Sequence, residues 1–173
     1  MTINTTVNII AQILGFGGVY MLFTLYQQKE RKKLLCRKLC ADVLWGMHYL
    51  FLGAWAGAIP NLVGIARESI FMNSGKKWAN SLAWPILFIA VSWCLTIASW
   101  RSAISLLPMC ASTLVTISFW VKSPKFTRLL SVPVCVSFII YDCFVGSYAG
   151  IINESISLVS IIISFFKNDF KKS

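Results

Sequence analysis

The side chains that could do chemistry in this sequence are few, and they lie inside strongly apolar segments. The ionisable ones, with two amides beside them, are Asp42, His48, Asn61, Arg67, Glu68, Asp142, Asn153 and Glu154. A charged group at bilayer depth costs about 2.5–3.5 kcal/mol on insertion scales, and such groups usually face the interior of a helix bundle or a water-filled cavity. These residues are therefore candidates for buried ion pairs or for binding a polar solute.

Three of these residues fall in the half of the molecule nearer the basic loops described below. We expect Asp42 and Arg67 to form a structural ion pair between the second and third helices, because either charge alone in hydrocarbon is costly. Glu68 is a poorer partner for this site, since adjacent helical residues point about 100° apart.

The other group lies within about 10 Å of the opposite helix ends, at a rise of 1.5 Å per residue. We expect Asn61, Glu154, His48 and Asp142 to line a polar cavity there that binds a substrate. Apart from Arg101 no Lys or Arg lies at this depth, which favours a cationic or polyhydroxyl solute over an anion. His48 changes charge between about pH 5 and 8, which suits proton coupling; it is equally read as a hydrogen-bonded packing residue.

A catalytic or metal site is not expected. The six cysteines form no CxxC pair, and they are Cys36, Cys40, Cys94, Cys110, Cys135 and Cys143. With one histidine in the chain, a zinc site lacks ligands. There is also no nucleophile–base motif and no soluble loop to hold a cofactor, so we expect neither enzyme activity nor a cofactor.

Composition places all of these residues in a membrane protein. The 173 residues are 57% hydrophobic and only 13% charged, with a mean hydropathy of +0.72. A soluble domain has about 25% charged residues. We therefore expect one membrane domain over residues 1–173, with the lipid bilayer as its partner. The net charge of +10 is no sign of nucleic-acid binding, because of where the basic residues lie.

The apolar segments predict an all-α fold with seven transmembrane helices, since a span needs about 20 mostly apolar residues. The expected spans are Thr6–Gln27, Leu39–Trp55, Gly57–Met72, Leu82–Trp100, Ala103–Val121, Leu129–Tyr148 and Gly150–Phe166. With seven spans, 14 of the 16 Lys and Arg residues fall on one side of the membrane. The positive-inside bias makes that side cytoplasmic, which puts the N-terminus outside and the C-terminus inside.

The two ends of the chain resemble each other at a shift of 93 residues. Gly53–Ile59 then lies on Gly146–Ile152, and the basic segment before the second helix lies on the one before the sixth. This predicts a parallel 3+1+3 repeat, with halves at about 6–73 and 103–167 and a linker helix at about 82–100. Transporters built from parallel repeats bind substrate between the halves.

In its residues and their order, the chain resembles the YgjV-type bacterial inner membrane proteins. The residues that resemble this family are Arg31-Lys32-Lys33, Asp42, Trp45, His48-Tyr49, Leu52-Gly53, Gly57, Asn61, Arg67, Leu106-Leu107-Pro108, Thr116, Trp120, Arg128, Gly146, Gly150 and Glu154. The resemblance implies a 3+1+3 helical fold in the bacterial inner membrane. That layout is similar to the wider MtN3/PQ-loop group, which includes sugar carriers, vitamin-precursor carriers and a retrieval receptor, although the dipeptide that names the group is absent.

Two functions fit these features. One is a multi-pass carrier of a small polar or cationic solute, which uses the polar residues between the repeat halves. The alternative is a membrane receptor, scaffold or accessory subunit without transport activity, in which the same polar residues serve folding. A cavity reachable by solvent would favour the carrier.

Overall fold

The protein is all-helical in the computed structural model, which describes residues 5–25, 31–73, 75–121 and 124–168. The described part contains α1 (Thr5–Leu25), α2 (Arg31–Phe51), α3 (Trp55–Phe71), α4 (Ala83–Ala98), α5 (Leu106–Val121), α6 (Pro124–Val145) and α7 (Tyr148–Asn168). Two short 3-10 helices, Trp78–Asn80 and Ala103–Ser105, precede α4 and α5. No strand occurs in these ranges. The all-α prediction is confirmed.

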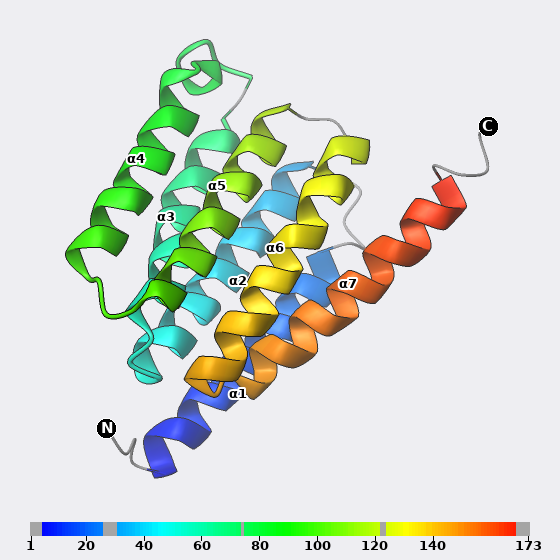
Figure 1. Cartoon of the computed structure of the whole chain (residues 1–173). Helices are drawn as coiled ribbons and strands as arrows, with labels where there is room; N and C mark the ends of the chain where they lie inside the picture. Colours follow the sequence, from blue (N-terminus) through cyan, green and yellow to red (C-terminus); the bar gives the residue numbers. More distant parts are fainter. Residues whose placement is uncertain (1–4, 26–30, 74, 122–123, 169–173) are drawn as a thin grey trace.

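Successive helices run in alternating directions along one bundle (Figure 1). α1 packs on α2 and α2 on α3, while α5 packs on α6 and α6 on α7. α4 lies at one edge of the bundle and contacts α3 and α5, and two further contacts, α1 with α7 and α3 with α5, join the early and late helices. The start of α1 and the end of α7 lie at opposite ends of the molecule (Figure 1).

Seven helices occupy the predicted segments, but two of them begin earlier than expected. α2 begins at Arg31 instead of near Leu39, and α6 at Pro124 instead of near Leu129. Arg and Lys are good helix formers, and proline suits the first helical position because no hydrogen bond is needed from its nitrogen. The basic residues expected in a loop thus include helical ones, and Lys38 lies two turns inside α2. The end expected for the first helix, Gln27, lies outside the described residues.

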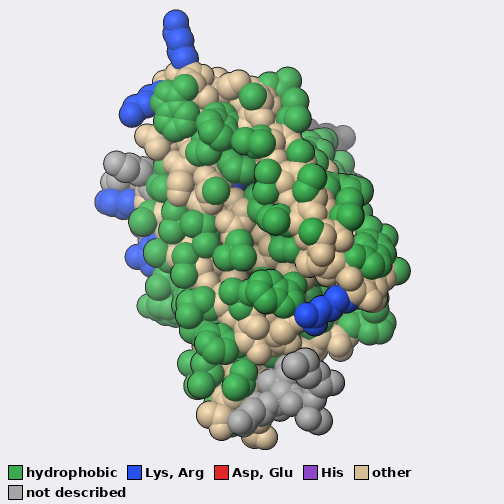
Figure 2. All heavy atoms as spheres, turned by 90° about the vertical axis from the view of Figure 1, so that its left-hand side faces the viewer, with side chains coloured by type: hydrophobic (Ala, Val, Ile, Leu, Met, Phe, Trp, Pro, Cys, Tyr) green, Lys and Arg blue, Asp and Glu red, His purple; other side chains and the backbone are tan. Residues whose placement is uncertain are grey.

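Large apolar side chains cover the outside of the bundle. Figure 2 shows one such face, on which hydrophobic side chains dominate and no Asp or Glu is visible. Ile13, Phe144 and Ile163 are each at least 60% exposed. A soluble monomer rarely exposes so much contiguous apolar surface, whereas lipid contacts it without cost. The surface is therefore that of a membrane protein.

Two helices are long and apolar enough to meet a strict criterion for a span, over Thr5–Leu22 of α1 and Arg128–Val145 of α6. Shorter apolar helical segments cover Ala83–Ala98, Ala103–Ser118 and Tyr148–Ile163. α2 and α3 are absent from both groups because they contain the buried charges and the basic start of α2. The two helices that hydropathy identifies least well thus contribute four buried ionisable side chains, Asp42, His48, Arg67 and Glu68.

The turns between α2 and α3 and between α6 and α7 share one backbone feature. Gly53 has φ of 67° and Gly146 has φ of 71°. This left-handed conformation costs other residues about 1–2 kcal/mol, which explains glycine at both turns. Each turn reverses the chain so that α3 packs against α2, and α7 against α6.

Candidate functional site

His48 of α2 is fully buried and joins its helix to α1 and to the α6–α7 turn. Its Nδ1 lies 2.6 Å from the carbonyl oxygen of Ala11 on α1, and its Nε2 lies 2.7 Å from Oγ of Ser147 in the α6–α7 turn. A carbonyl oxygen only accepts, so Nδ1 bears the proton and donates it. In the neutral ring Nε2 then accepts from the Ser147 hydroxyl. Both ring nitrogens are satisfied, as in a hydrogen-bonded packing residue.

Two tyrosines add hydrogen bonds between the early and late helices. The Tyr49 hydroxyl donates to Asp142 Oδ1 over 2.8 Å, and the Gly57 backbone N–H donates to the Tyr141 hydroxyl over 2.9 Å. All four residues are buried. The rings of Tyr49 and Tyr141 pack edge to face with centroids 6.1 Å apart. The outer layer, as we name these residues with His48 and Ser147, therefore links α2 and α3 to α6.

Gln12 extends the outer layer to α1. Its Nε2 donates to the Gly146 carbonyl over 3.0 Å, and its Oε1 accepts from the Ala149 N–H over 3.2 Å. The backbones are close here, because a Cβ added to Gly15 would lie 2.6 Å from Ala149 Cβ. The outer layer is packed and hydrogen-bonded.

Of the residues in the outer layer, His48 and Asp142 were predicted from the sequence as site residues, whereas Tyr49, Tyr141 and Ser147 were not. A usable signal existed for one of them. Tyr49 and Asp142 are 93 positions apart, so the internal shift aligns the two residues that touch. Tyr141 and Ser147 gave no such signal, since hydroxyl residues in apolar segments are common and only the fold brings them to Gly57 and His48.

The other two expected residues, Asn61 and Glu154, border the outer layer but make their hydrogen bonds to residues other than His48 and Asp142. Asn61 Nδ2 donates to the Gly57 carbonyl over 2.9 Å, and Glu154 Oε1 accepts from Asn153 Nδ2 over 2.9 Å. Glu154 also faces the Cys135 thiol on α6. The structure therefore places His48 and Asp142 in the packed outer layer and separates them from Asn61 and Glu154 in hydrogen bonding. That these four bind a solute together stays a prediction.

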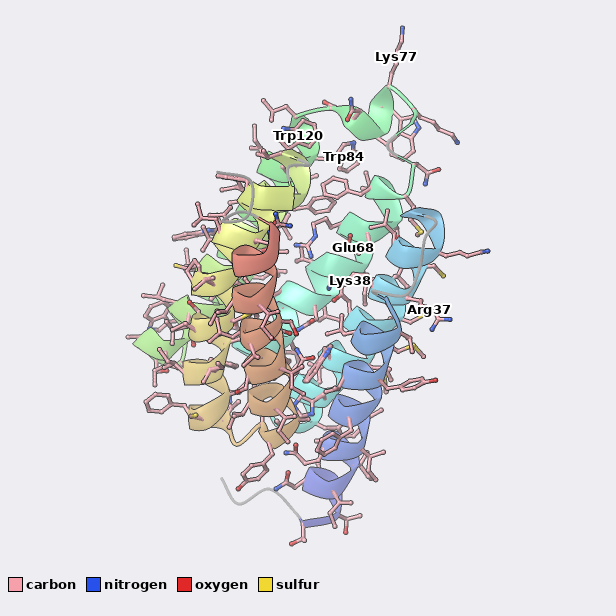
Figure 3. All side chains as sticks on the ribbon, turned by 90° about the vertical axis from the view of Figure 1, so that its right-hand side faces the viewer. Arg37, Lys38, Glu68, Lys77, Trp84 and Trp120 are labelled. Carbon is pink, nitrogen blue, oxygen red and sulfur yellow. The ribbon has the colours of Figure 1, made fainter. Side chains whose placement is uncertain are left out.

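The buried charges nearer the other end form two ion pairs. Lys38 Nζ pairs with Asp42 Oδ1 within α2, and Arg67 Nη2 lies 3.1 Å from Glu68 Oε1 within α3. Arg67 Nη1 also donates to Thr116 Oγ1 of α5 over 3.2 Å. Asp42, Arg67 and Glu68 are at most 3% exposed. Figure 3 shows Lys38 and Glu68 toward the interior and Arg37 directed outward.

The structure thus pairs Asp42 with Lys38 and Arg67 with Glu68, while the expected ion pair between Asp42 and Arg67 stays a prediction. Because α2 begins at Arg31, Lys38 lies one turn before Asp42 on the same helix face and reaches its carboxylate. The long Arg67 side chain bends back to its neighbour Glu68, which the 100° argument on adjacent residues did not allow for. Asp42 and Arg67 are still close, since a Cβ on Gly64 would lie 2.6 Å from Asp42 Oδ2 and 3.5 Å from Arg67 Nη2.

A cavity of about 70 Å³ lies beside these ion pairs. Its lining comes from α2, α3, α5 and α6, and consists of Lys38, Asp42, Pro60, Asn61, Arg67, Ser112, Val115 and Phe138. At about 30 Å³ of liquid volume per water molecule, this is room for about two waters or a small solute. We call it the central cavity. It offers ammonium and guanidinium donors beside carboxylate and amide acceptors, which suits binding of a small polar molecule.

Lys38 also lies within electrostatic range of Glu154 on α7. The sequence placed Lys38 in a loop, and so it predicted that Glu154 had no cation nearby. The longer α2 brings this cation into the bundle, between the carboxylate of its own helix and that of α7. This removes the main reason for expecting a cationic solute.

The described residues contain no arrangement that supports metal binding. No group of three or more His, Cys, Asp or Glu side chains there is placed to hold an ion. Cys135 is buried, and the other five cysteines are exposed on the apolar outside of the bundle.

Comparison with known families places the chain in the membrane independently of its helices. A family model described as bacterial inner membrane protein, Imp-YgjV, matches residues 9–172. Comparisons with curated proteins and with solved structures find no match. The family match covers nearly every residue, including both ion pairs, the central cavity and the outer layer. The chain therefore belongs to the Imp-YgjV family of bacterial inner membrane proteins.

Proposed function

We propose that this inner membrane protein is a carrier of a small polar solute, which binds in the central cavity. The observation behind the proposal is that buried charged side chains, Lys38, Asp42 and Arg67, line a cavity. Ion pairs that serve only folding gain nothing from an adjoining void, because lost packing contacts destabilise. Intramembrane ionisable groups beside a cavity are typical of solute pathways.

The parallel 3+1+3 repeat is part of this proposal. α2 and α6 begin 93 residues apart, as do α3 and α7. The turn glycines Gly53 and Gly146 have the same separation and nearly equal φ values. Exchanging the halves also exchanges the contact of α1 with α7 for that of α5 with α3. These relations support two like halves joined by α4, with the central cavity between them, where parallel-repeat carriers bind substrate.

We also propose seven membrane crossings, with the N-terminus outside and the C-terminus in the cytoplasm. Seven helices of alternating direction that begin and end at opposite ends of the bundle support an odd number of crossings. Trp84 and Trp120 lie toward the end where Lys77 projects (Figure 3). Aromatic rings near a helix end are typical of either membrane interface, and lysine there is typical of the cytoplasmic one.

In the proposed cycle the outer layer is the closed gate between the central cavity and the periplasm. Its bonds, Tyr49 to Asp142 and His48 to Ser147, cross from the first half to the second. Separation of the halves at this end would break both bonds and open the cavity outward. The ion pairs Lys38–Asp42 and Arg67–Glu68 each lie within one helix, so they would persist through that movement.

Purified protein in proteoliposomes tests the proposal. Stopped-flow light scattering would follow entry of single solutes from four classes: polyols, zwitterions, organic cations and organic anions. We expect at least one class to enter faster than in empty liposomes. Ser112→Phe, which fills the central cavity, should abolish this entry. The matched control is Ser155→Phe on the exposed face of α7, which should transport normally. Equal rates for empty liposomes and wild type in all classes would refute the carrier.

A receptor or scaffold is the second candidate, favoured by the packing of the outer layer. Its buried ring nitrogens and most of its polar atoms are satisfied without a ligand, as a purely structural layer requires. In that case Ser112→Phe would change no flux. The liposome assay therefore separates the two candidates, provided that both variants elute as a single symmetrical peak in size-exclusion chromatography.

A further inference from the structure

We infer that the solute bound in the central cavity is a small zwitterion, in which a carboxylate and an ammonium group are attached to the same carbon atom or to adjacent ones. This inference rests on the proposed carrier function and names the substrate class of the same cavity. It differs from the cationic solute that the sequence predicts, and the difference follows from the position of Lys38.

The four charges of the two ion pairs beside the central cavity sum to zero. Lys38 is paired with Asp42, and Arg67 with Glu68. A solute with a net charge would bind beside these ion pairs without a counter-ion, at a depth where an uncompensated charge is costly. A zwitterion brings both signs and leaves the balance unchanged. Net-neutral solutes are therefore favoured over simple cations and anions.

Lys38 provides the recognition of a carboxylate. An ammonium group has three N–H donors, and in the structure Lys38 uses one of them, toward Asp42 Oδ1. Its side chain is 21% exposed, so the remaining donors can be reached. Charge-assisted hydrogen bonds are roughly twice as strong as neutral ones. A carboxylate therefore gains more from Lys38 than the hydroxyl of a polyol would.

Two acceptors in the same lining suit an ammonium group. Asp42 is 1% exposed and lines the cavity, and its Oδ2 accepts no hydrogen bond from any described residue. A buried carboxylate oxygen without a donor is costly. Asn61 uses its Nδ2 to bond the Gly57 carbonyl, which leaves its Oδ1 as an acceptor beside the cavity. A ligand ammonium could satisfy one or both oxygens.

The size of the cavity limits the rest of the solute. A volume of about 70 Å³ suits a small solute, and the remaining walls include the apolar residues Pro60, Val115 and Phe138. The best-fitting solutes are therefore glycine and its nearest homologues, with little beyond the two charged groups.

Four small probes separate the classes: glycine, its size-matched analogue glycinamide, and the larger N-acetylglycine and erythritol. Glycinamide lacks the carboxylate, N-acetylglycine lacks the ammonium, and erythritol lacks both. Thermal shift of the full-length protein in detergent would measure binding, and proteoliposome entry would measure transport. We expect glycine to bind at least about tenfold more tightly than each of the other three, because each lacks at least one charge-assisted bond.

The variant Lys38→Gln should lower glycine affinity about tenfold or more without lowering the affinity for glycinamide, since the lost donor recognises the carboxylate and Asp42 remains to accept the ammonium group. Lys33→Gln, on an exposed lysine of the same helix, is the matched control and should bind as wild type does. Equal binding of glycine and erythritol would overturn the zwitterion, as would tighter binding of glycinamide. If erythritol crosses the membrane and glycine does not, the carrier function stands and this inference fails.

Discussion

Tyr49 on α2 donates a hydrogen bond to Asp142 on α6 over 2.8 Å, and these residues are 93 positions apart, the same shift that aligns the two halves of the sequence. Under the proposed repeat they occupy equivalent places and meet across the axis between the halves. The repeat uses an aromatic donor in one half and an acidic acceptor in the other, so two like helices can form an asymmetric bond.

Removing this hydrogen bond should lower the stability of the protein. Tyr49→Phe removes the donor and leaves a fully buried carboxylate with one partner fewer, which should cost about 1.5–3 kcal/mol. The melting temperature in detergent should fall clearly, and Asp142→Asn added to Tyr49→Phe should cost less than the two single losses combined. Tyr20→Phe, at a tyrosine 63% exposed, is the control. An unchanged melting temperature for Tyr49→Phe would show that the bond contributes nothing.

A second prediction concerns the ion pair within α3. Glu68→Ala leaves Arg67 buried beside Thr116 without its carboxylate, and stranding one member of a buried pair costs about 3–5 kcal/mol. Folded yield should drop sharply. Adding Arg67→Ala should recover part of it, because the stranded charge is removed as well. Strictly additive losses in a double-mutant cycle would argue against the pairing.

The turn glycines give a third prediction. Gly53→Ala and Gly146→Ala should each lower stability by about 1–2 kcal/mol, because a Cβ is disfavoured at φ near +70°. Neither position has an atom within 4 Å of the added Cβ, so the cost is conformational. Gly75→Ala also meets no atom and has no positive φ, and it should be neutral. Equal melting temperatures for all three variants would contradict the turn geometry.

Much of the fold could be predicted from the sequence because its signals are local. Apolar segments placed seven helices, and the glycines before Ala54 and Ser147 located the outer turns. The start of α2 could not be found by hydropathy, since a basic helical turn at a membrane surface and a basic loop have the same composition. That error moved Lys38 out of the bundle, so its ion pair with Asp42 was not predicted.

The site was predictable only in part, because its side-chain directions depend on packing. The sequence named Asn61, Asp42 and Arg67, and all three line the central cavity. It did not identify Ser112 on α5, whose hydroxyl is ordinary in a membrane helix. Nor could the sequence show that Asn61 and His48 belong to different sites, since both lie within a few turns of a helix end. Only the contacts in the structure place Asn61 at the central cavity and His48 in the outer layer.

The proposed topology yields a fourth prediction. A reporter that is active only in the cytoplasm, fused after Ser173, should be active, because an odd number of crossings with basic loops inside places the C-terminus there. A reporter that is active only in the periplasm, fused at the same residue, should be silent. The reverse pattern would refute the orientation.

The central claim is that the cavity between the halves opens to each side of the membrane in turn. It is tested most directly by the reactivity of Val115→Cys, at an apolar residue of the cavity lining, in a chain whose six native cysteines are replaced by serine or alanine. A small charged thiol reagent that cannot cross lipid would be added to right-side-out and to inside-out vesicles in separate experiments. Modification is expected from both sides, and glycine should slow it. Modification from one side alone, or from neither in folded protein, would contradict it.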